Sequence, residues 1–134
     1  MTIERGRNWG GPASPGSVDE VASSNEELRR LVEDQWQVRG HSPRIGLTGG
    51  DLWKALGEPS GGIERINSSK ARQVPVDVIE CRLDGRPCLA VAHVFLFNNW
   101  WRGPVVAIMN SEWRGVWRVA PKAHPNDGML DLVE

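Results

Sequence analysis

The sequence lacks a strong net charge, and this limits the partners that the chain could bind by long-range electrostatic attraction. Its 134 residues include 16 Lys and Arg and 17 Asp and Glu, which gives a net charge of −1. A chain this close to neutrality has no broad positive field with which to hold duplex nucleic acid or an anionic membrane surface. A local basic patch is compatible with the same count. We therefore expect no nucleic-acid partner.

Long hydrophobic runs are also missing. No stretch approaches the roughly 20 consecutive apolar residues that a membrane-spanning helix needs. The first residues, Met1 to Arg5, contain no apolar segment of the kind found in a secretory signal peptide. We therefore expect no transmembrane segment and a cytoplasmic location.

Cysteine is scarce. The chain has two, Cys81 and Cys88, on either side of a turn predicted at Asp84-Gly85. In a hairpin these side chains could face each other, but two thiols in a chain without a signal peptide are more often reduced and packed. Two cysteines alone also cannot complete a structural zinc site. We expect two reduced thiols.

What is present has the composition of an ordinary globular protein, 40% hydrophobic and 25% charged. A chain of this length can bury about two-thirds of its unfolded surface. Residues 1–23, which contain several glycines and prolines, are expected to form a loop or arm. Residues 24–134 are expected to form one domain that is β-rich from residue 74.

Helical signals cluster in the first half of the chain. The run Ser24-Asn25-Glu26-Glu27 has the form of a capping box, and apolar residues then recur at helical spacing until Gly40. Residues 52–56 predict a second, short helix that ends at Gly57.

From residue 74 onward the pattern is that of β-strands. Short-period alternation reaches Leu83, Asp84-Gly85 predicts a hairpin, and an apolar run follows from Leu89 to Phe97. Further strand candidates lie at residues 105–109, 116–120 and 129–133. We predict an α+β fold in which the N-terminal helix and the short helix pack on a mainly antiparallel β-sheet or sandwich.

A glycine-containing loop, Thr48, Gly49, Gly50 and Asp51, precedes the short helix. Glycines allow a backbone to pass close to a ligand, and a helix N-terminus presents free N–H groups to an anion. Asp51 could cap the helix, or it could reach a cation held by phosphates. The local sequence leaves both interpretations open.

Two acidic residues four positions apart, Asp127 and Asp131, lie close to the end of the sequence. Asp127 with Gly128 suits a tight turn, and Asp131 in a following strand would normally face solvent. The same carboxylates could take a proton from an alcohol or hold Mg²⁺. His93, in an apolar strand, is expected to be a core or edge residue.

Three Trp-Arg pairs are unusual among the 7 tryptophans: Trp101-Arg102, Trp113-Arg114 and Trp117-Arg118. Aromatic rings interleaved with cations can stack on bases or bind the headgroup region of a lipid surface. Alternating strand faces would give the same pattern, with tryptophan inward and arginine outward. The near-neutral net charge favours this packing interpretation.

Four separated segments form an ordered set of motifs. Leu47 to Gly57 is similar to a Gly-Thr-Gly-Asn-Asp-(Leu/Phe)-x-x-x-Leu-Gly segment, and Val76-Asp77 fits a strand-borne Val-Asp. Residues 110–115 fit an Asn-x-x-x-x-Gly strand-turn. Ala120 to Asp131 is similar to Ala-Pro-x-Ala-x-x-x-Asp-Gly-x-Leu-Asp, the most specific of the four. In this order, the segments resemble the diacylglycerol kinase, sphingosine kinase and bacterial lipid kinase superfamily.

The resemblance implies ATP-dependent phosphoryl transfer to a lipid hydroxyl, with ATP and Mg²⁺ as cofactors. The family's site lies in the cleft between a nucleotide-binding domain and a β-rich domain. By this resemblance Asp51 would belong to the acidic network near the phosphates and the metal, in the same loop as residues 48–50. Asp127 would act as the base on the acceptor alcohol, with Asp131 as a nearby secondary acid.

The sequence departs from the family pattern in its first third. Residues 1–43 contain no Gly-Gly-Asp-Gly-Thr nucleotide loop, which the family carries before the first motif. The resemblance therefore implies an active kinase only if another chain or an oligomer supplies that loop. The alternatives are a non-catalytic lipid- or phosphate-binding regulatory module, or a fragment of a longer kinase. The implied partners are a lipid substrate at the membrane periphery and a protein partner or second copy.

Overall fold

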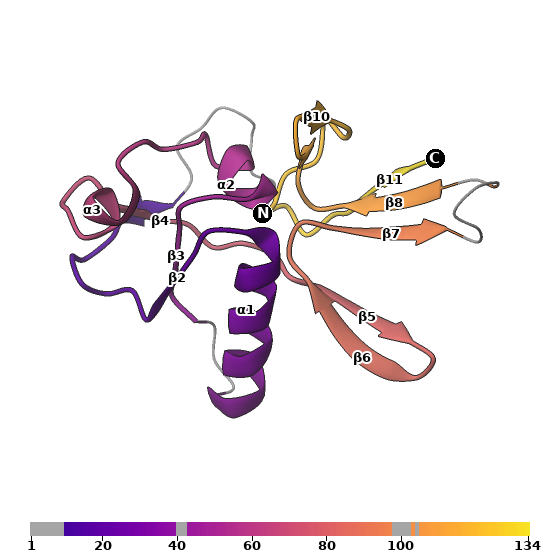
Figure 1. Cartoon of the computed structure of the whole chain (residues 1–134), viewed down its shortest axis with the longest axis horizontal. Helices are drawn as coiled ribbons and strands as arrows, with labels where there is room; N and C mark the ends of the chain where they lie inside the picture. The colour runs from indigo at the N-terminus through magenta and orange to yellow at the C-terminus, as the bar shows by residue number, and fades with distance from the viewer. Residues whose placement is uncertain (1–9, 40–42, 98–102, 104) are drawn as a thin grey trace.

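The computed structural model describes residues 10–39, 43–97, 103 and 105–134, and Figure 1 traces their path. The described residues form a few helices and several small, mostly antiparallel sheets, which confirms a mixed and mostly β structure. The helices are α1 (Asn25–Arg39), α2 (Asp51–Ala55) and α3 (Gly62–Ile66). The strands in the first half are β1 (Gly11–Pro12), β2 (Glu20–Ala22), β3 (Ile45–Leu47) and β4 (Arg72–Gln73). The remaining strands are β5 (Ile79–Leu83), β6 (Arg86–Ala90), β7 (His93–Phe97), β8 (Val105–Met109), β9 (Trp113–Arg114), β10 (Trp117–Arg118) and β11 (Asp131–Val133).

Helix α1 begins at the predicted capping box. The Ser24 hydroxyl accepts the Glu27 N–H at 3.2 Å, which satisfies one of the free donors of the first turn. The Glu27 carboxylate accepts the backbone N–H of Ser23 at 2.8 Å and its hydroxyl at 2.9 Å. In a capping box the Glu carboxylate usually accepts the N–H of the cap residue itself. Here it accepts the N–H of Ser23, the residue before the cap.

The segment expected to be a loop or arm contains two strands in its described part, which begins at residue 10. Strand β1 pairs antiparallel with β4, and β2 pairs in parallel with β3. The Ala13 N–H also donates to the Ala71 carbonyl at 3.0 Å. Ala22 of β2 is fully buried. These hydrogen bonds to β3, β4 and Ala71 hold the segment against the rest of the chain. The glycines and prolines of the segment do not predict such bonds, because the partners are distant in the sequence.

The described residues form two hydrophobic cores, one in each of the two halves seen in Figure 1. The first lies between α1, β2, α2 and the residues that follow β6, and its buried members are Ala22, Leu28, Val32, Leu52, Val91 and Ala92. The second lies on one face of the antiparallel sheet β11-β8-β7, and its buried members are Ala107, Met109, Ala120 and Ala123. The segment between β6 and β8 therefore passes from one core to the other.

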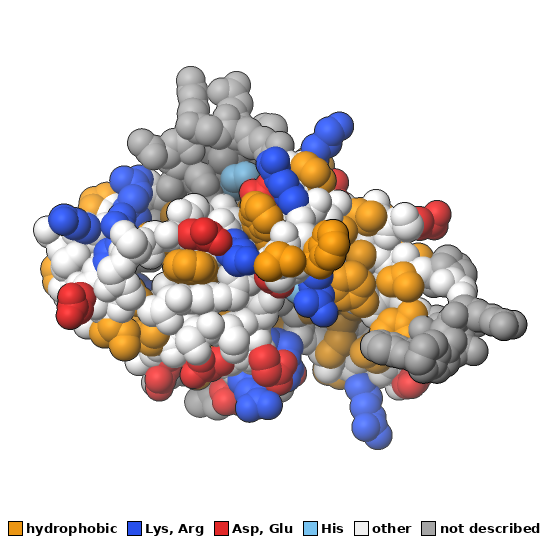
Figure 2. Space-filling model, turned by 45° about the horizontal axis from the view of Figure 1, so that its top comes forward, with side chains coloured by type: hydrophobic (Ala, Val, Ile, Leu, Met, Phe, Trp, Pro, Cys, Tyr) orange, Lys and Arg blue, Asp and Glu red, His pale blue; other side chains and the backbone are white. Residues whose placement is uncertain are grey.

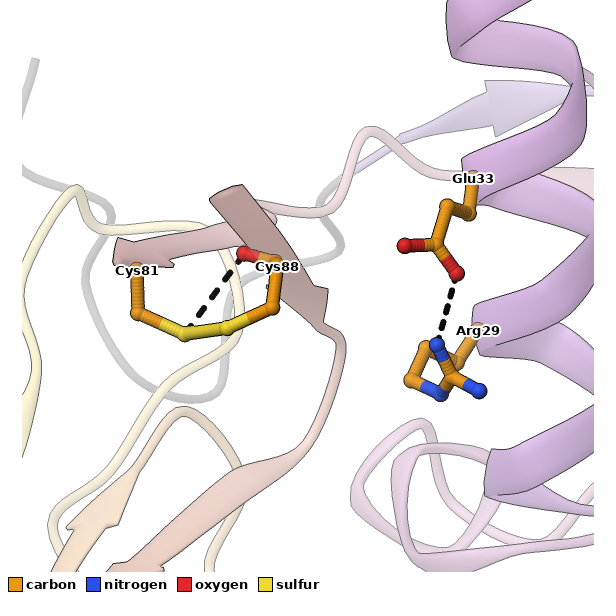
Figure 3. Close-up of a disulfide and its surroundings, with 4 residues drawn as sticks. All are labelled: Arg29, Glu33, Cys81 and Cys88. Carbon is orange, nitrogen blue, oxygen red and sulfur yellow. Dashed lines mark hydrogen bonds and ion pairs between the residues drawn. A yellow bond between two sulfur atoms is a disulfide. The ribbon is translucent and has the colours of Figure 1, made fainter. Parts of the chain in front are cut away.

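The β5–β6 hairpin confirms the predicted turn at Asp84-Gly85. Both turn residues have positive φ, 49° at Asp84 and 77° at Gly85, as a two-residue type I′ turn requires. The resulting register places Cys81 opposite Cys88, with their Cα atoms 5.3 Å apart. The two cysteines form a disulfide (Figure 3). The prediction of reduced thiols was wrong, because the short turn brings the residues to the spacing that a disulfide needs.

The Trp-Arg pairs follow the predicted inward and outward alternation only in part. In the hairpin of β9 and β10, Trp117 lies opposite Arg114, so a tryptophan and an arginine share one face. Trp117 is 72% exposed, whereas Trp113 is half-buried. The pair at residues 101–102 lies outside the described residues. Among the described residues, no helix is both long and apolar enough to cross a membrane.

Candidate functional site

The glycine-containing loop before α2 packs against the start of α1. A Cβ at Gly49 would collide with the Ser23 carbonyl oxygen, and one at Gly50 would lie 2.6 Å from the Asn25 side-chain oxygen. Gly50 also has a φ of 96°, which few other residues adopt. The Thr48 N–H donates to the Ala22 carbonyl at 3.0 Å. The described contacts of this loop thus account for its glycines by close packing within the chain.

Asp51 stands at the first position of α2 and joins three parts of the chain. Its Oδ2 accepts the Asn25 amide at 2.9 Å, while its backbone N–H donates to the other atom of that amide, Oδ1, at 2.8 Å. Its Oδ1 accepts the Gly115 N–H at 2.7 Å. Asp51 is only 7% exposed. The side chain does not cap α2, so the N-cap interpretation was wrong; it ties α1 to the turn between β9 and β10.

His93, at the start of β7, is the titratable neighbour of Asp51. Its Nδ1 lies 3.8 Å from Asp51 Oδ2, and the His93 side chain is 16% exposed. Within the described residues, this buried nitrogen has no hydrogen-bond partner. Burial lowers the pKa of His93 below its usual value of 6.5; the Asp51 carboxylate opposes the shift and Arg114 adds to it. A neutral imidazole therefore faces a buried carboxylate.

Asn110 and Ser111 follow β8 and link Asp51 to a second acidic residue. The Asn110 amide, fully buried, donates to the Asp77 carbonyl at 2.8 Å and to the Val91 carbonyl at 3.1 Å. The Ser111 hydroxyl donates to the Asp51 carbonyl at 3.1 Å. The neighbouring residues Asn110 and Ser111 thus bind Asp77 and Asp51, which are 26 positions apart in the sequence.

Asp77 in turn holds the loop that contains Asp127. The Asp77 carboxylate accepts the Gly128 N–H at 2.8 Å, and its backbone N–H donates to the Pro125 carbonyl at 2.7 Å. Asp127 Oδ1 accepts the Met129 N–H at 2.9 Å, which closes an Asx turn. Asp127 therefore forms the turn that its sequence suggested, and it retains a second carboxylate oxygen.

Asp131 lies in β11, opposite Met109 of β8, and is half-buried. In the described parts of the chain, no three His, Cys, Asp or Glu side chains are grouped so that they could hold a metal ion. The structure thus brings Asp51 next to His93 but does not assemble Asp51, Asp127 and Asp131 into one metal-binding cluster.

Two members of the site were missed in the sequence, Asn25 and His93. Asn25 was interpreted only as part of a capping box, and His93 only as a core or edge residue. No local pattern reports either role, because both depend on α2 packing against elements distant in the sequence. The order of the four motifs was the one signal that pointed to Asp77 and Asn110.

No protein-family model matches the chain, and no curated protein or solved structure matches it either.

Proposed function

We propose that the chain is a diacylglycerol-kinase-like module that forms the lipid-facing wall of a phosphoryl-transfer site. The supporting observation is that hydrogen bonds join the four motif segments into one network. Asp51 of the first segment binds Gly115 of the third, Asn110 of the third binds Asp77 of the second, and Asp77 binds Gly128 of the fourth.

This network is a stronger argument than the motifs alone. Segments that match a family by chance have no reason to meet in space. Here they meet through Asn110, which is fully buried, and Asp51, which is nearly so. Buried polar groups are stable only when their partners are in place, so such contacts fix the relative position of the segments. In this proposal, residues 74–134 form the core of the family's β-rich domain, an antiparallel sheet or sandwich.

Asp127 is the base in this proposal. Its Oδ1 is used by the turn, whereas Oδ2 makes no hydrogen bond with the described residues and can take a proton from a lipid hydroxyl. Asp131 is the secondary acid nearby. Phosphoryl transfer depends mainly on positioning and charge neutralisation, so these acids need a nucleotide site that a protein partner or a second copy supplies.

The residues described do not fit a magnesium ion at Asp51. Both carboxylate oxygens accept hydrogen bonds, and the residue is 7% exposed, whereas Mg²⁺ binds octahedrally and usually keeps several waters. Asp51 instead holds the Gly115 turn and the start of α1 in place for the site. ATP and Mg²⁺ would bind mainly through the partner's loop.

The test is transfer of labelled phosphate from ATP·Mg²⁺ to diacylglycerol in mixed micelles. Asp127→Asn should lower the rate at least about 100-fold, because an amide cannot accept the hydroxyl proton. The melting temperature should stay nearly unchanged, since asparagine can also close the turn. The control is Asp84→Asn, in an exposed hairpin turn, which should keep the wild-type rate. Equal rates for wild type and Asp127→Asn would show that Asp127 forms the turn but is not the base.

A second candidate is a non-catalytic module that binds a lipid or phosphate group. The engaged carboxylate of Asp51 and the missing nucleotide loop favour it. Calorimetry with ATP·Mg²⁺ separates the two. No heat at millimolar nucleotide, together with no phosphoryl transfer by the wild type at any protein concentration, would exclude a kinase in which a second copy of the chain supplies the nucleotide loop.

A further inference from the structure

The hairpin of β9 and β10 ends in an exposed apolar tip. Its two-residue loop is Gly115-Val116, and Gly115 has a φ of 62°, which suits the first position of a type II′ turn. Val116 is 79% exposed and Trp117 is 72% exposed, the highest values among the large hydrophobic side chains described. The hairpin stands at the top of Figure 1.

The neighbours of this tip are basic. Arg114 lies opposite Trp117 across the hairpin, and Lys54 lies over the Trp113 ring at 5.8 Å from its centroid. The Arg118 guanidinium pairs with Glu112 at 2.7 Å. Figure 2, which brings the top of Figure 1 forward, shows hydrophobic and basic side chains beside one another on this face. The apolar tip therefore lies beside three basic side chains, of which Arg118 is paired with Glu112, whereas Lys54 and Arg114 form no ion pair with the described residues.

This combination matches the interface of an anionic bilayer. Tryptophan is enriched at the level of lipid headgroups, and arginine and lysine keep their charged ends in water while their stems lie along apolar surface. A protein partner would also cover apolar groups, but an apolar tip as narrow as one turn gives little area for a stable protein interface.

The tip is held rigidly against the candidate site. The Gly115 N–H donates to the Asp51 carboxylate at 2.7 Å, and the Gly115 carbonyl accepts the Lys54 ammonium at 2.7 Å. Both Asp51 and Lys54 belong to α2. A preorganised tip loses little conformational freedom on docking. Any surface that the tip contacts also lies next to the Asp51 network.

We propose that the tip, Val116 and Trp117, inserts into the headgroup region of an anionic lipid bilayer and places the Asp51 network at the membrane surface. The proposal rests on the proposed function for its choice of a lipid surface. Its physical basis is the exposed tip, the neighbouring cations and the bonds to Gly115, none of which requires phosphoryl transfer.

Cosedimentation with vesicles tests this docking without catalysis. The probe is a vesicle of equal parts phosphatidylserine and phosphatidylcholine, without diacylglycerol or ATP, compared with pure phosphatidylcholine. Wild type should bind the anionic vesicles more strongly. Val116→Asp should lower the partition coefficient roughly tenfold, because it places a charge in the apolar tip. The matched control is Ile63→Asp in α3, where the native side chain is 59% exposed, and it should bind like wild type.

Brominated lipids give a second measurement. They should quench wild-type tryptophan fluorescence, and Trp117→Phe should retain binding but lose most of the quenching. Equal partitioning of Val116→Asp and Ile63→Asp would overturn the proposal, as would wild type that binds neither vesicle. Vesicle binding without any phosphoryl transfer would leave the docking proposal standing and would count only against the proposed function in which a second copy supplies the nucleotide loop.

Discussion

At the scale of single residues, the Asp51 carboxylate is held by donors from two distant segments, and the His93 imidazole faces it without a described hydrogen bond. The distance of 3.8 Å from Nδ1 to Oδ2 is too long for a hydrogen bond. Because burial disfavours the imidazolium, His93 stays neutral in the folded chain near pH 7.

This arrangement predicts how stability changes with pH. The folded-state pKa of His93 lies below 6.5, so the unfolded chain binds the proton more readily between those two values. The free energy of unfolding should therefore fall as the pH drops through about 6.5 toward the folded-state pKa. Asp51 and Arg114 are the charged groups that influence His93. Chemical denaturation at pH 8 to 5 measures the effect.

The variant His93→Gln should lack this step. Glu26 and Glu27 also have lowered pKa values, from Arg29 and from Ser23 respectively, so their contributions are lost only at more acidic pH. Identical pH profiles for wild type and His93→Gln would show that His93 is not buried as the structure places it.

At the scale of elements, two local signals of the sequence predicted their elements correctly, whereas contacts between distant segments could not be predicted. The capping box at Ser24 predicted α1, and the turn at Asp84-Gly85 predicted the β5–β6 hairpin. Both predictions succeeded because each feature depends only on residues a few positions apart in the sequence. The glycines at 49 and 50 also marked a close approach. Their neighbour, the start of α1, could not be predicted, since it requires the packing of two helices.

The hairpin disulfide is an element-scale feature with a measurable effect. The loop between Cys81 and Cys88 is short, with a sequence separation of 7, so the chain-entropy contribution is about 2 kcal/mol. Addition of a reductant should lower the free energy of unfolding by up to this amount. The double variant Cys81→Ser/Cys88→Ser should be destabilised similarly and should not respond to reductant. If the wild type unfolded at the same urea concentration with and without reductant, the disulfide would be contradicted. The measurement is urea denaturation.

At the scale of the whole molecule, the four motif segments join the two cores. The sequence shows these segments in this order, and their resemblance to the lipid kinase superfamily stays a prediction. The sequence could not predict that Asn110 would be fully buried between Asp77 and Val91, because that position depends on both cores being formed. The roles of Asp127 and Asp131 in catalysis stay predictions, since the structure reports a turn and a strand position for them.

The central claim is that these segments act as one network, and a double-mutant cycle between Asp51 and Asp77 tests it most directly. The two residues share no direct bond and are connected through Asn110 and Ser111. Asp51→Ala should cost about 2–4 kcal/mol of unfolding free energy, because it leaves buried donors unsatisfied. The measurement is urea denaturation of both single variants and the double variant. The account predicts a coupling energy above about 0.5 kcal/mol, whereas additive effects within that limit would contradict a continuous network.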